Sequence, residues 1–179
     1  MTSKIKEPWI ALGYDLFAKE GPKGLKVEVI ARKVGKSKSS FYHHFADLEV
    51  FTELLLAHHL QRTKIMAQRE ALCENVDPEL IQVLLDFKQD LFFSRQLRVN
   101  REVKTFKECF EKANQEVGSV FLEVWAKDIG LQGKNGLAST VLDFTTENFY
   151  LQLTEENLNY RWLSNYFKEI KQMVGGIKR

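Results

Sequence analysis

Apolar residues recur every three or four positions along most of the chain, which is the spacing that gives an α-helix one buried face. The first such run places apolar residues at positions 9, 10, 13, 16 and 17. Gly21, Pro22 and Gly24 follow this run and predict a turn. No stretch alternates apolar and polar residues well enough to compete as a strand. The pattern therefore predicts an all-α protein.

Two short helices are predicted next. Residues 27–34 carry a helical apolar pattern that Gly35 ends. Ser37 is a suitable N-cap for the following helix, in which Phe41 and Phe45 lie four residues apart on an inner face. Two helices of about eight residues joined by a glycine turn have the helix-turn-helix layout. The pattern alone leaves a plain helix pair with a solvated polar face as an equal alternative.

The other helices are predicted from their boundaries. Asp47 is the expected cap of a fourth helix. Asp77-Pro78 combines a capping acid with a proline at the first helical position, before Leu80, Leu84, Phe87 and Leu91 on one face. Gly130, Gly133 and Gly136 predict a long loop. Further helices are expected near 100–115, 117–128, 137–153 and 157–174, the last ended by Gly175-Gly176.

Composition excludes several protein classes. The chain has 179 residues, 44% hydrophobic and 28% charged, an ordinary balance for one globular domain. The longest purely apolar run covers residues 54–57, too short to cross a bilayer, and no signal peptide is apparent. Cys73 and Cys109 form no CxxC spacing, which favours a reducing cytosol and excludes a finger-type zinc site. We expect a cytoplasmic protein with no cofactor.

Charge is distributed unevenly. Residues 1–64 hold 11 Lys and Arg against 7 Asp and Glu, a local net charge of +4, although the whole chain carries only +2. The N-terminal third is therefore the expected site of an anionic partner, although many solvated surfaces carry a similar bias.

The N-terminal residues are similar to those of the TetR family of bacterial transcription regulators. The matching segments are LFAKEG at 16–21 and IARKVGKSKSSFYHHF at 30–45, within a similarity that covers about residues 9–56. Two positions depart from the family pattern. Lys26 replaces a threonine that caps the second helix and holds a phosphate, and Leu48 replaces a lysine. Lys36, in the turn, is a basic residue that can supply the phosphate contact missing at Leu48.

The resemblance implies DNA contacts from the turn and the third helix. Positions 38–40 match the family's base-reading residues, position 42 a backbone or base-edge contact, and position 44 a phosphate contact. The predicted DNA-binding residues are Lys26, Lys36, Ser37, Lys38, Ser39, Ser40, Tyr42, His43 and His44. The histidine pairs 43–44 and 58–59 point about 100° apart on a helix, so we expect no metal site.

The family often holds an apolar effector among its middle helices, and the aromatic residues beyond position 64 are suited to lining such a pocket. The predicted effector-binding residues are Leu84, Phe87, Lys88, Phe106, Phe110, Trp125, Phe144 and Glu147. Ordinary core packing is the alternative for each aromatic residue. A small apolar or aromatic effector is expected.

The broad apolar stripe of the last helix must be buried against its own chain or against a second copy. The resemblance favours a homodimer, with an interface formed by Trp162, Leu163, Tyr166, Phe167 and Ile170.

These observations predict a helix-turn-helix domain over 1–46 and an effector-binding and dimerisation domain over 47–179. The expected function is a sequence-specific regulator, a repressor released from a palindromic operator by its effector. No enzyme motif such as GxSxG or a P-loop is present, so catalysis is not expected. Two alternatives remain: a helical carrier or partner-binding module that no longer binds DNA, and a sequence-tolerant architectural DNA binder.

Overall fold

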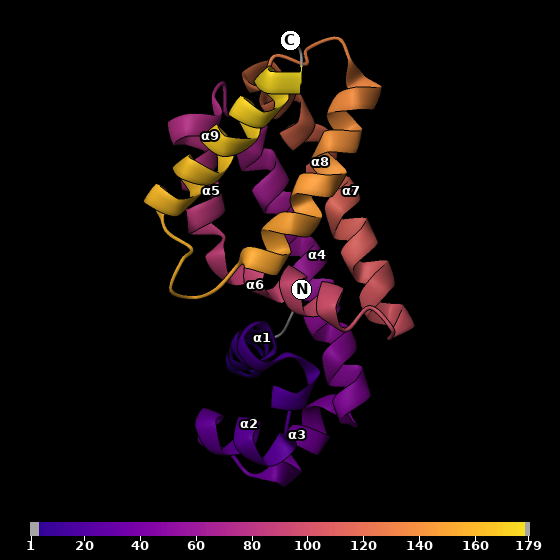
Figure 1. Cartoon of the computed structure of the whole chain (residues 1–179). Coiled ribbons are helices and arrows are strands. Elements are labelled where there is room, and N and C mark those ends of the chain that lie inside the picture. Colours follow the sequence, from indigo (N-terminus) through magenta and orange to yellow (C-terminus); the bar gives the residue numbers. More distant parts are fainter. Residues whose placement is uncertain (1–3, 178–179) are drawn as a thin grey trace. The chain divides into compact units, whose positions relative to one another are not determined.

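The computed structural model describes residues 4–177, apart from the side chains of Asn135 and Ile177, and this part of the chain contains no strand. The first helices are α1 (Glu7–Glu20), the 3₁₀ turn η1 (Gly21–Gly24), α2 (Val27–Val34), α3 (Lys38–Phe45) and α4 (Leu48–Glu70). A π-helical turn η2 (Val76–Leu80) precedes α5 (Ile81–Asp86), α6 (Lys88–Val99), α7 (Lys104–Asp128), α8 (Asn135–Gln152) and α9 (Tyr160–Ile177) (Figure 1).

Local sequence signals place the first four helices where they were predicted. Gly35 ends α2 in the left-handed region, at φ 72°, which a residue without Cβ adopts without strain. Ser37 caps α3 by accepting a hydrogen bond from the Ser40 backbone N–H at 3.1 Å. Asp47 likewise accepts from the Val50 N–H at 2.8 Å at the start of α4. The predicted all-α class is confirmed.

Three boundary predictions are wrong. Residues 104–128 form one helix, α7, instead of two, and Gly118 lies inside it. Helix α9 continues past Gly175 and Gly176. A glycine inside a helix costs only about 1 kcal/mol relative to alanine, so it does not by itself end a helix. Gly136 likewise lies inside α8, whereas Gly130 and Gly133 do form the predicted loop, with φ of 69° and 77°.

Asp77 does not cap a helix as predicted. Its carboxylate accepts hydrogen bonds from the Tyr160 hydroxyl and from the Ser164 hydroxyl, the latter at 2.6 Å. Both partners lie on α9. The Asp77 carboxylate therefore makes a long-range contact instead of accepting hydrogen bonds from the backbone N–H groups of its own helix start. The predicted apolar face is also divided between two helices, since α5 ends at Asp86 and α6 begins at Lys88.

The helices pack as two compact units. The first comprises the chain through Arg62 together with Gln89–Ala113, and the second comprises Thr63–Lys88 and the chain from Asn114 onward. Helices α4 and α7 each contribute to both units. Packing therefore divides the chain differently from the predicted domain boundary after residue 46, which marks the end of α3.

Aromatic rings fill the core of the first unit. Phe17, Phe41, Phe51 and Phe93 are each 0% exposed. Phe17 stacks on Phe93 with ring centroids 4.3 Å apart, so α1 packs against α6. A Cβ added to Gly13 would lie 2.4 Å from Cζ of Phe51, and the missing side chain therefore allows α1 to approach α4 closely.

In the second unit α9 packs against α7 and α8. The ring of Phe167 lies 6.1 Å from that of Phe121 on α7. The Tyr166 hydroxyl donates to the Thr145 carbonyl of α8 at 2.7 Å, and burial raises the pKa of this tyrosine. Lys171 pairs with Asp128 at 2.7 Å. The last helix thus covers its apolar face within its own chain.

Candidate nucleic-acid interface

The turn between α2 and α3 is held by backbone hydrogen bonds. The Gly35 N–H donates to the Arg32 carbonyl at 3.1 Å, and the Lys36 N–H donates to the Ala31 carbonyl at 2.9 Å. These bonds satisfy carbonyls at the end of α2 while Gly35 turns the chain into α3. The helix-turn-helix geometry predicted from the sequence is present, grouped with α1 and the start of α4 (Figure 1).

Helix α3 has an inner face and an outer face. Phe41 and Phe45 are 0% and 1% exposed, and their rings lie 5.8 and 5.9 Å from that of Trp9 on α1. On the opposite side Tyr42 is 52% exposed. Because the inner rings fix the helix, its outer side chains are presented from a rigid support.

The predicted DNA-binding residues lie at the surface of this unit. Ser40 and His44 are partly buried, and the other seven, Lys26, Lys36, Ser37, Lys38, Ser39, Tyr42 and His43, are exposed. Ser40 is held by the Ser37 cap, and His44 lies edge-on to Trp9 at 6.2 Å. Lys26 precedes α2 in an extended conformation. Its side chain makes no cap, because an ammonium group cannot accept a hydrogen bond from a backbone N–H. The arrangement places hydroxyls, a phenol, an imidazole and ammonium groups on one short segment.

An ion pair that the sequence analysis missed joins α2 to α3. The ammonium group of Lys38 bonds to the carboxylate of Glu28 and lowers the pKa of that carboxyl. Both side chains are more than half exposed, so water screens the pair and its contribution is small. Any anion or base that binds Lys38 must compete with Glu28. No local pattern could have revealed this contact, because the residues are ten positions apart on different helices.

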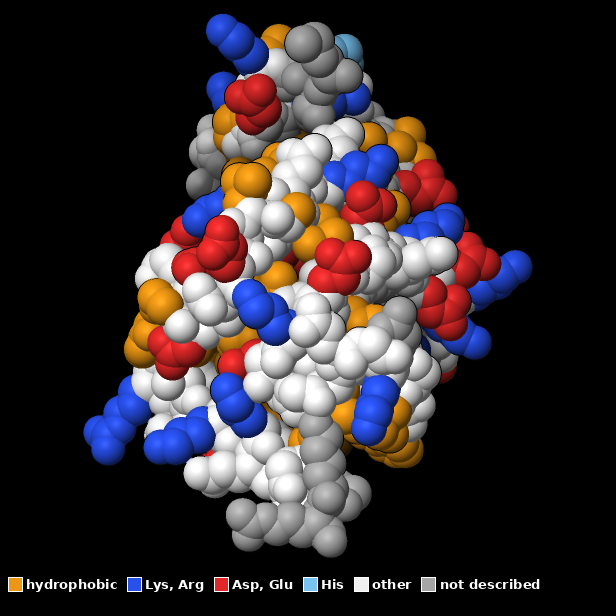
Figure 2. Space-filling model, turned by 90° about the horizontal axis from the view of Figure 1, so that it is seen from above, with side chains coloured by type: hydrophobic (Ala, Val, Ile, Leu, Met, Phe, Trp, Pro, Cys, Tyr) orange, Lys and Arg blue, Asp and Glu red, His pale blue; other side chains and the backbone are white. Residues whose placement is uncertain are grey.

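One face of the molecule carries charges of both signs (Figure 2). On the face drawn in Figure 2, Lys and Arg side chains are interspersed with Asp and Glu, and hydrophobic side chains form small groups between them. The described residues of that face therefore do not form the single-sign basic stripe that is typical of a nucleic-acid surface.

A buried polar network joins α1, α4 and α6 in the first unit. The Tyr14 hydroxyl donates to Asp90 at 2.7 Å and lies 2.7 Å from Nδ1 of His59. Since the only hydroxyl proton of Tyr14 goes to Asp90, Nδ1 of His59 must be the donor to Tyr14, and its Nε2 accepts from Ser94 at 3.1 Å. Arg62 completes the network with two hydrogen bonds to Asp90, at 2.5 and 2.7 Å.

Burial decides the protonation of this network. It raises the pKa of Tyr14 well above its ordinary range, and the charge of Asp90 adds to the effect. It also lowers the pKa of His59 to about 4, so this imidazole is neutral at pH 7. The bonds to Asp90 raise the pKa of Arg62. The sequence analysis missed this network because directly bonded members of it lie up to 76 positions apart.

The eight predicted effector-binding residues divide between the two units. Phe106 contacts Phe17 edge-on at 5.4 Å, and Phe110 also packs against the core of the first unit. The others belong to the second unit. There Lys88 donates to the carbonyls of Glu155 and Leu158, each at 3.2 Å. Leu84, Phe87 and Trp125 are buried, Glu147 is partly buried, and Phe144 is 75% exposed.

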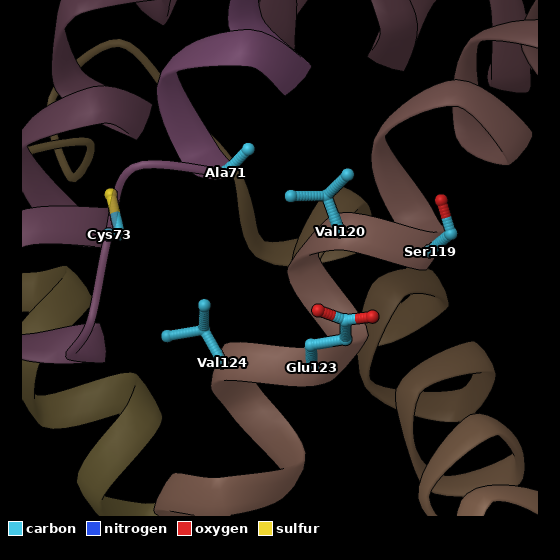
Figure 3. A pocket seen from close by; sticks show the side chains of 6 residues that line it. All are labelled: Ala71, Cys73, Ser119, Val120, Glu123 and Val124. Carbon is cyan, nitrogen blue, oxygen red and sulfur yellow. The ribbon is translucent and has the colours of Figure 1, made fainter.

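A partly open pocket of about 210 Å³ lies within the second unit (Figure 3). One wall is the end of α4 and the segment after it, and the other is α7, from which two valines point toward the first wall. The lining residues are Ala71, Cys73, Ser119, Val120, Glu123 and Val124. None of the eight predicted effector-binding residues lines this pocket. No aromatic residue lines the pocket, so a prediction based on aromatic residues does not find it.

The five predicted interface residues of α9 are largely covered by their own chain. Leu163 is 0% exposed, and Tyr166, Phe167 and Ile170 are 7–8% exposed. Trp162 is partly buried and stacks on Tyr166 with ring centroids 5.4 Å apart. The unpartnered stripe is on α8 instead, where Leu137, Phe144 and Leu151 are 53%, 75% and 67% exposed.

Two kinds of feature are absent from the described residues. No group of three or more His, Cys, Asp or Glu side chains is placed to hold a metal ion. None of the helices is long and apolar enough to cross a membrane.

Known proteins match the N-terminal segment in sequence and the whole chain in fold. The model of the N-terminal domain of the bacterial regulatory proteins of the tetR family matches residues 10–49. A comparison with curated proteins gives no match. A Rhodococcus sp. protein described as a TetR-family transcriptional regulator has 17% identity, a TM-score of 0.53, and coverage of 97% of this chain and 96% of its own. One from Mesorhizobium loti MAFF303099 has 18% identity, a TM-score of 0.56, and coverage of 96% and 95%. The tetR family model thus matches the helix-turn-helix segment of this chain, and two solved proteins described as members of that family share its fold.

Proposed function

We propose that this regulator reads a palindromic operator as a homodimer and acts as a repressor that a small apolar or aromatic effector releases. The observation that carries the proposal is the outer face of α3, where Tyr42 is 52% exposed beside Lys38 and Ser39 while Phe41 and Phe45 anchor the helix. A helix that enters the major groove needs such a face, with cations for phosphate and polar groups for base edges.

Selection from a random-sequence duplex pool tests this proposal. Enrichment is carried out at about 0.15 M salt, where binding still depends on phosphate neutralisation, and in excess competitor DNA. We expect a palindrome whose half-sites are about 34–36 Å apart, one helical turn. Binding that competitor removes points to the architectural alternative, and no binding at all points to the carrier alternative.

Two lysine variants separate base reading from backbone binding. Lys38→Ala is expected to relax base preference at one position and cost about 1–3 kcal/mol on the selected operator, because a bidentate contact to guanine would be lost. Lys36→Ala is expected to weaken binding to all sequences equally and to reduce the salt slope by about one unit. Both are measured by titrating matched operator and scrambled duplexes. An equal loss for Lys38→Ala on both duplexes would refute its base-reading role.

The exposed stripe on α8 supports the homodimer. Leu137, Phe144 and Leu151 are spaced seven residues apart, which places them on one face of the helix. We expect Phe144→Glu to yield a folded monomer and to weaken operator binding at least about tenfold, because a charge in an apolar interface is costly. Light scattering gives the mass. Asp143→Asn, at an exposed position of the same helix, serves as the control. A dimeric Phe144→Glu variant would place the interface elsewhere.

Effector release is proposed to work by population shift. A ligand moves an equilibrium between two shapes only through its different affinity for them, and such couplings are typically about 1–3 kcal/mol. Helix α4 supports this route because it is continuous: Leu48–Arg62 belong to the unit that carries α3, and Thr63–Glu70 belong to the unit that holds the pocket.

A further inference from the structure

We propose that Glu28 and Lys38 together read one G·C base pair of the operator, Lys38 through guanine and Glu28 through the amino group of cytosine. This inference rests on the proposed function and deepens it, because it names the base pair at one operator position and adds Glu28 to the residues that determine specificity. It is carried by the ion pair that joins α2 to α3, by the place of that pair at the start of α3, and by the charge around it.

The ion pair lies at the end of α3 where a recognition helix contacts bases. In a helix-turn-helix the N-terminal residues of the second helix contact the base edges. Lys38 is the first residue of α3, and its ammonium group donates a hydrogen bond to Oε1 of Glu28 on α2. The carboxylate of Glu28 is therefore held within one hydrogen bond of a group that is placed to read a base.

Both side chains of the pair are accessible to a ligand. The Glu28 side chain is 62% exposed and the Lys38 side chain is 54% exposed. An ammonium group has three N–H donors and a carboxylate has about four acceptor sites, so one bond between them leaves most of this capacity for other partners. The bond with Lys38 lowers the pKa of Glu28, so the carboxylate is charged at pH 7. The pair thus presents a donor and an acceptor side by side at the start of α3.

Glu28 differs in charge from the residues around it. Residues 26–45 hold five Lys and Arg, and Glu28 is the single acid among them. Phosphates repel a carboxylate, so binding to the DNA backbone does not favour an acid on this segment. A base edge does favour one, because Glu and Asp accept hydrogen bonds from the N4 amino group of cytosine.

The major-groove edge of a G·C pair is complementary to this ion pair. Guanine presents two adjacent acceptors, N7 and O6, and cytosine presents its N4 donor beside O6. When guanine binds the Lys38 ammonium it competes with Glu28 for that group, and the cytosine amino group gives the carboxylate a donor in its place. An A·T pair places the adenine donor between its two acceptors, so it offers Lys38 no adjacent acceptors. A thymine in place of the cytosine would set its O4 acceptor against the Glu28 carboxylate.

A duplex with one altered base tests the role of Glu28. The probe is the selected operator with 2-pyrimidinone, which lacks the N4 amino group, in place of the cytosine at the position where Lys38→Ala relaxes base preference. Fluorescence anisotropy titration of the full-length protein at about 0.15 M salt gives the affinity for each duplex. We expect the wild type to lose at least about fivefold more affinity on the altered duplex than Glu28→Ala loses, because only the wild type gives up a hydrogen bond to a charged group. The weaker base pairing of the altered duplex affects both proteins equally.

Two further variants exclude an effect of charge alone. Glu53→Ala removes an exposed acid of α4 and should lose as much affinity on the altered duplex as the wild type loses. The double variant Glu28→Lys with Lys38→Glu keeps the net charge and exchanges the donor and the acceptor, so it should no longer prefer G·C at this position. Circular dichroism checks the fold of each variant, and we expect all of them to fold because the substituted side chains are exposed.

Three outcomes overturn the inference. These are equal losses on the altered duplex for the wild type and Glu28→Ala, the absence of a G·C pair whose preference Lys38→Ala relaxes, and a double variant that still prefers G·C. If Glu28→Ala binds every duplex more tightly and by the same factor, Glu28 only repels phosphates. Each of these results leaves the proposed function intact, since the protein still binds its operator. A protein that enriches no operator refutes the proposed function and this inference together.

Discussion

Asp90→Ala is expected to lower the free energy of unfolding by about 3 kcal/mol, near the lower end of the range for breaking a buried ion pair. Asp90 is 3% exposed and accepts hydrogen bonds from Tyr14 and from two nitrogens of Arg62. Its removal leaves a buried hydroxyl and a guanidinium without their acceptor. The loss falls at the low end because the Arg62 side chain is 34% exposed and water can hydrate it in part.

Urea denaturation measures this loss, and the chain offers a matched control. Asp86 also pairs with an arginine, Arg69 at 2.5 Å, but those side chains are 37% and 44% exposed. Asp86→Ala should therefore cost less than about 1 kcal/mol. Equal losses for the two variants would show that burial does not determine how much each ion pair contributes to the free energy of unfolding. Because Asp90 connects α6 to α1, we also expect Asp90→Ala to weaken operator binding.

Stability is expected to fall by about 2 kcal/mol between pH 6.5 and pH 8, and Glu70 is the cause. Burial raises the pKa of Glu70 to about 8 in the folded state, against 4.5 in the unfolded chain. Across this interval the unfolded chain has given up a proton that the folded protein retains. The stability that this group contributes is complete below pH 4.5 and is lost as the pH rises through 8.

His59 acts in the opposite direction at lower pH. Its pKa is about 4 when folded and 6.5 when unfolded, so its contribution is complete above pH 6.5 and declines as the pH falls toward 4. Between pH 4.5 and 6.5 the two slopes oppose each other, and the profile should be nearly level. Above pH 6.5 only the Glu70 slope remains.

Glu70→Gln isolates this effect. The variant should keep its stability between pH 6.5 and 8 and lose it between pH 6.5 and 4, where His59 acts unopposed and burial also lowers the pKa of His58. Urea denaturation at a series of pH values gives both profiles. If Glu70→Gln falls between pH 6.5 and 8 as steeply as the wild type, another group titrates there, and the carboxyl of Glu70 is not the buried acid described above.

The helix-turn-helix was predictable because its signals are local. Ser37 caps the helix that starts at the next residue, and Gly35 adopts the left-handed conformation that turns the chain at its own position. Phe41 and Phe45 are four residues apart, so they face inward together. Each signal acts within a few residues, so spacing alone specifies it. The outward positions of Lys38, Ser39 and Tyr42 follow from the same spacing.

Predictions beyond this segment failed where long-range contacts compete with local rules. Asp77 has the sequence context of a helix cap, yet it binds Tyr160 and Ser164 on α9. Gly118 has the context of a helix end, yet α7 continues through it. For Asp77 the tertiary partners contribute more than the local preference, and the sequence pattern does not name those partners. Gly118 stays inside α7 because a glycine costs only about 1 kcal/mol within a helix.

The sequence by itself determined the all-α class, the first four helices, the outward face of α3 and the family resemblance. Only the tertiary structure decided which polar groups are buried. Glu70 lies on a helix whose pattern does not distinguish it from a surface acid, and its burial depends on the helices packed around it. Tyr14, His59 and Asp90 meet because three helices converge, and the α9 stripe is covered because it packs against α7 and α8. Which polar side chains are buried, and which partners they bind, depends on how the helices pack. Packing brings together residues whose separation in the sequence follows no pattern.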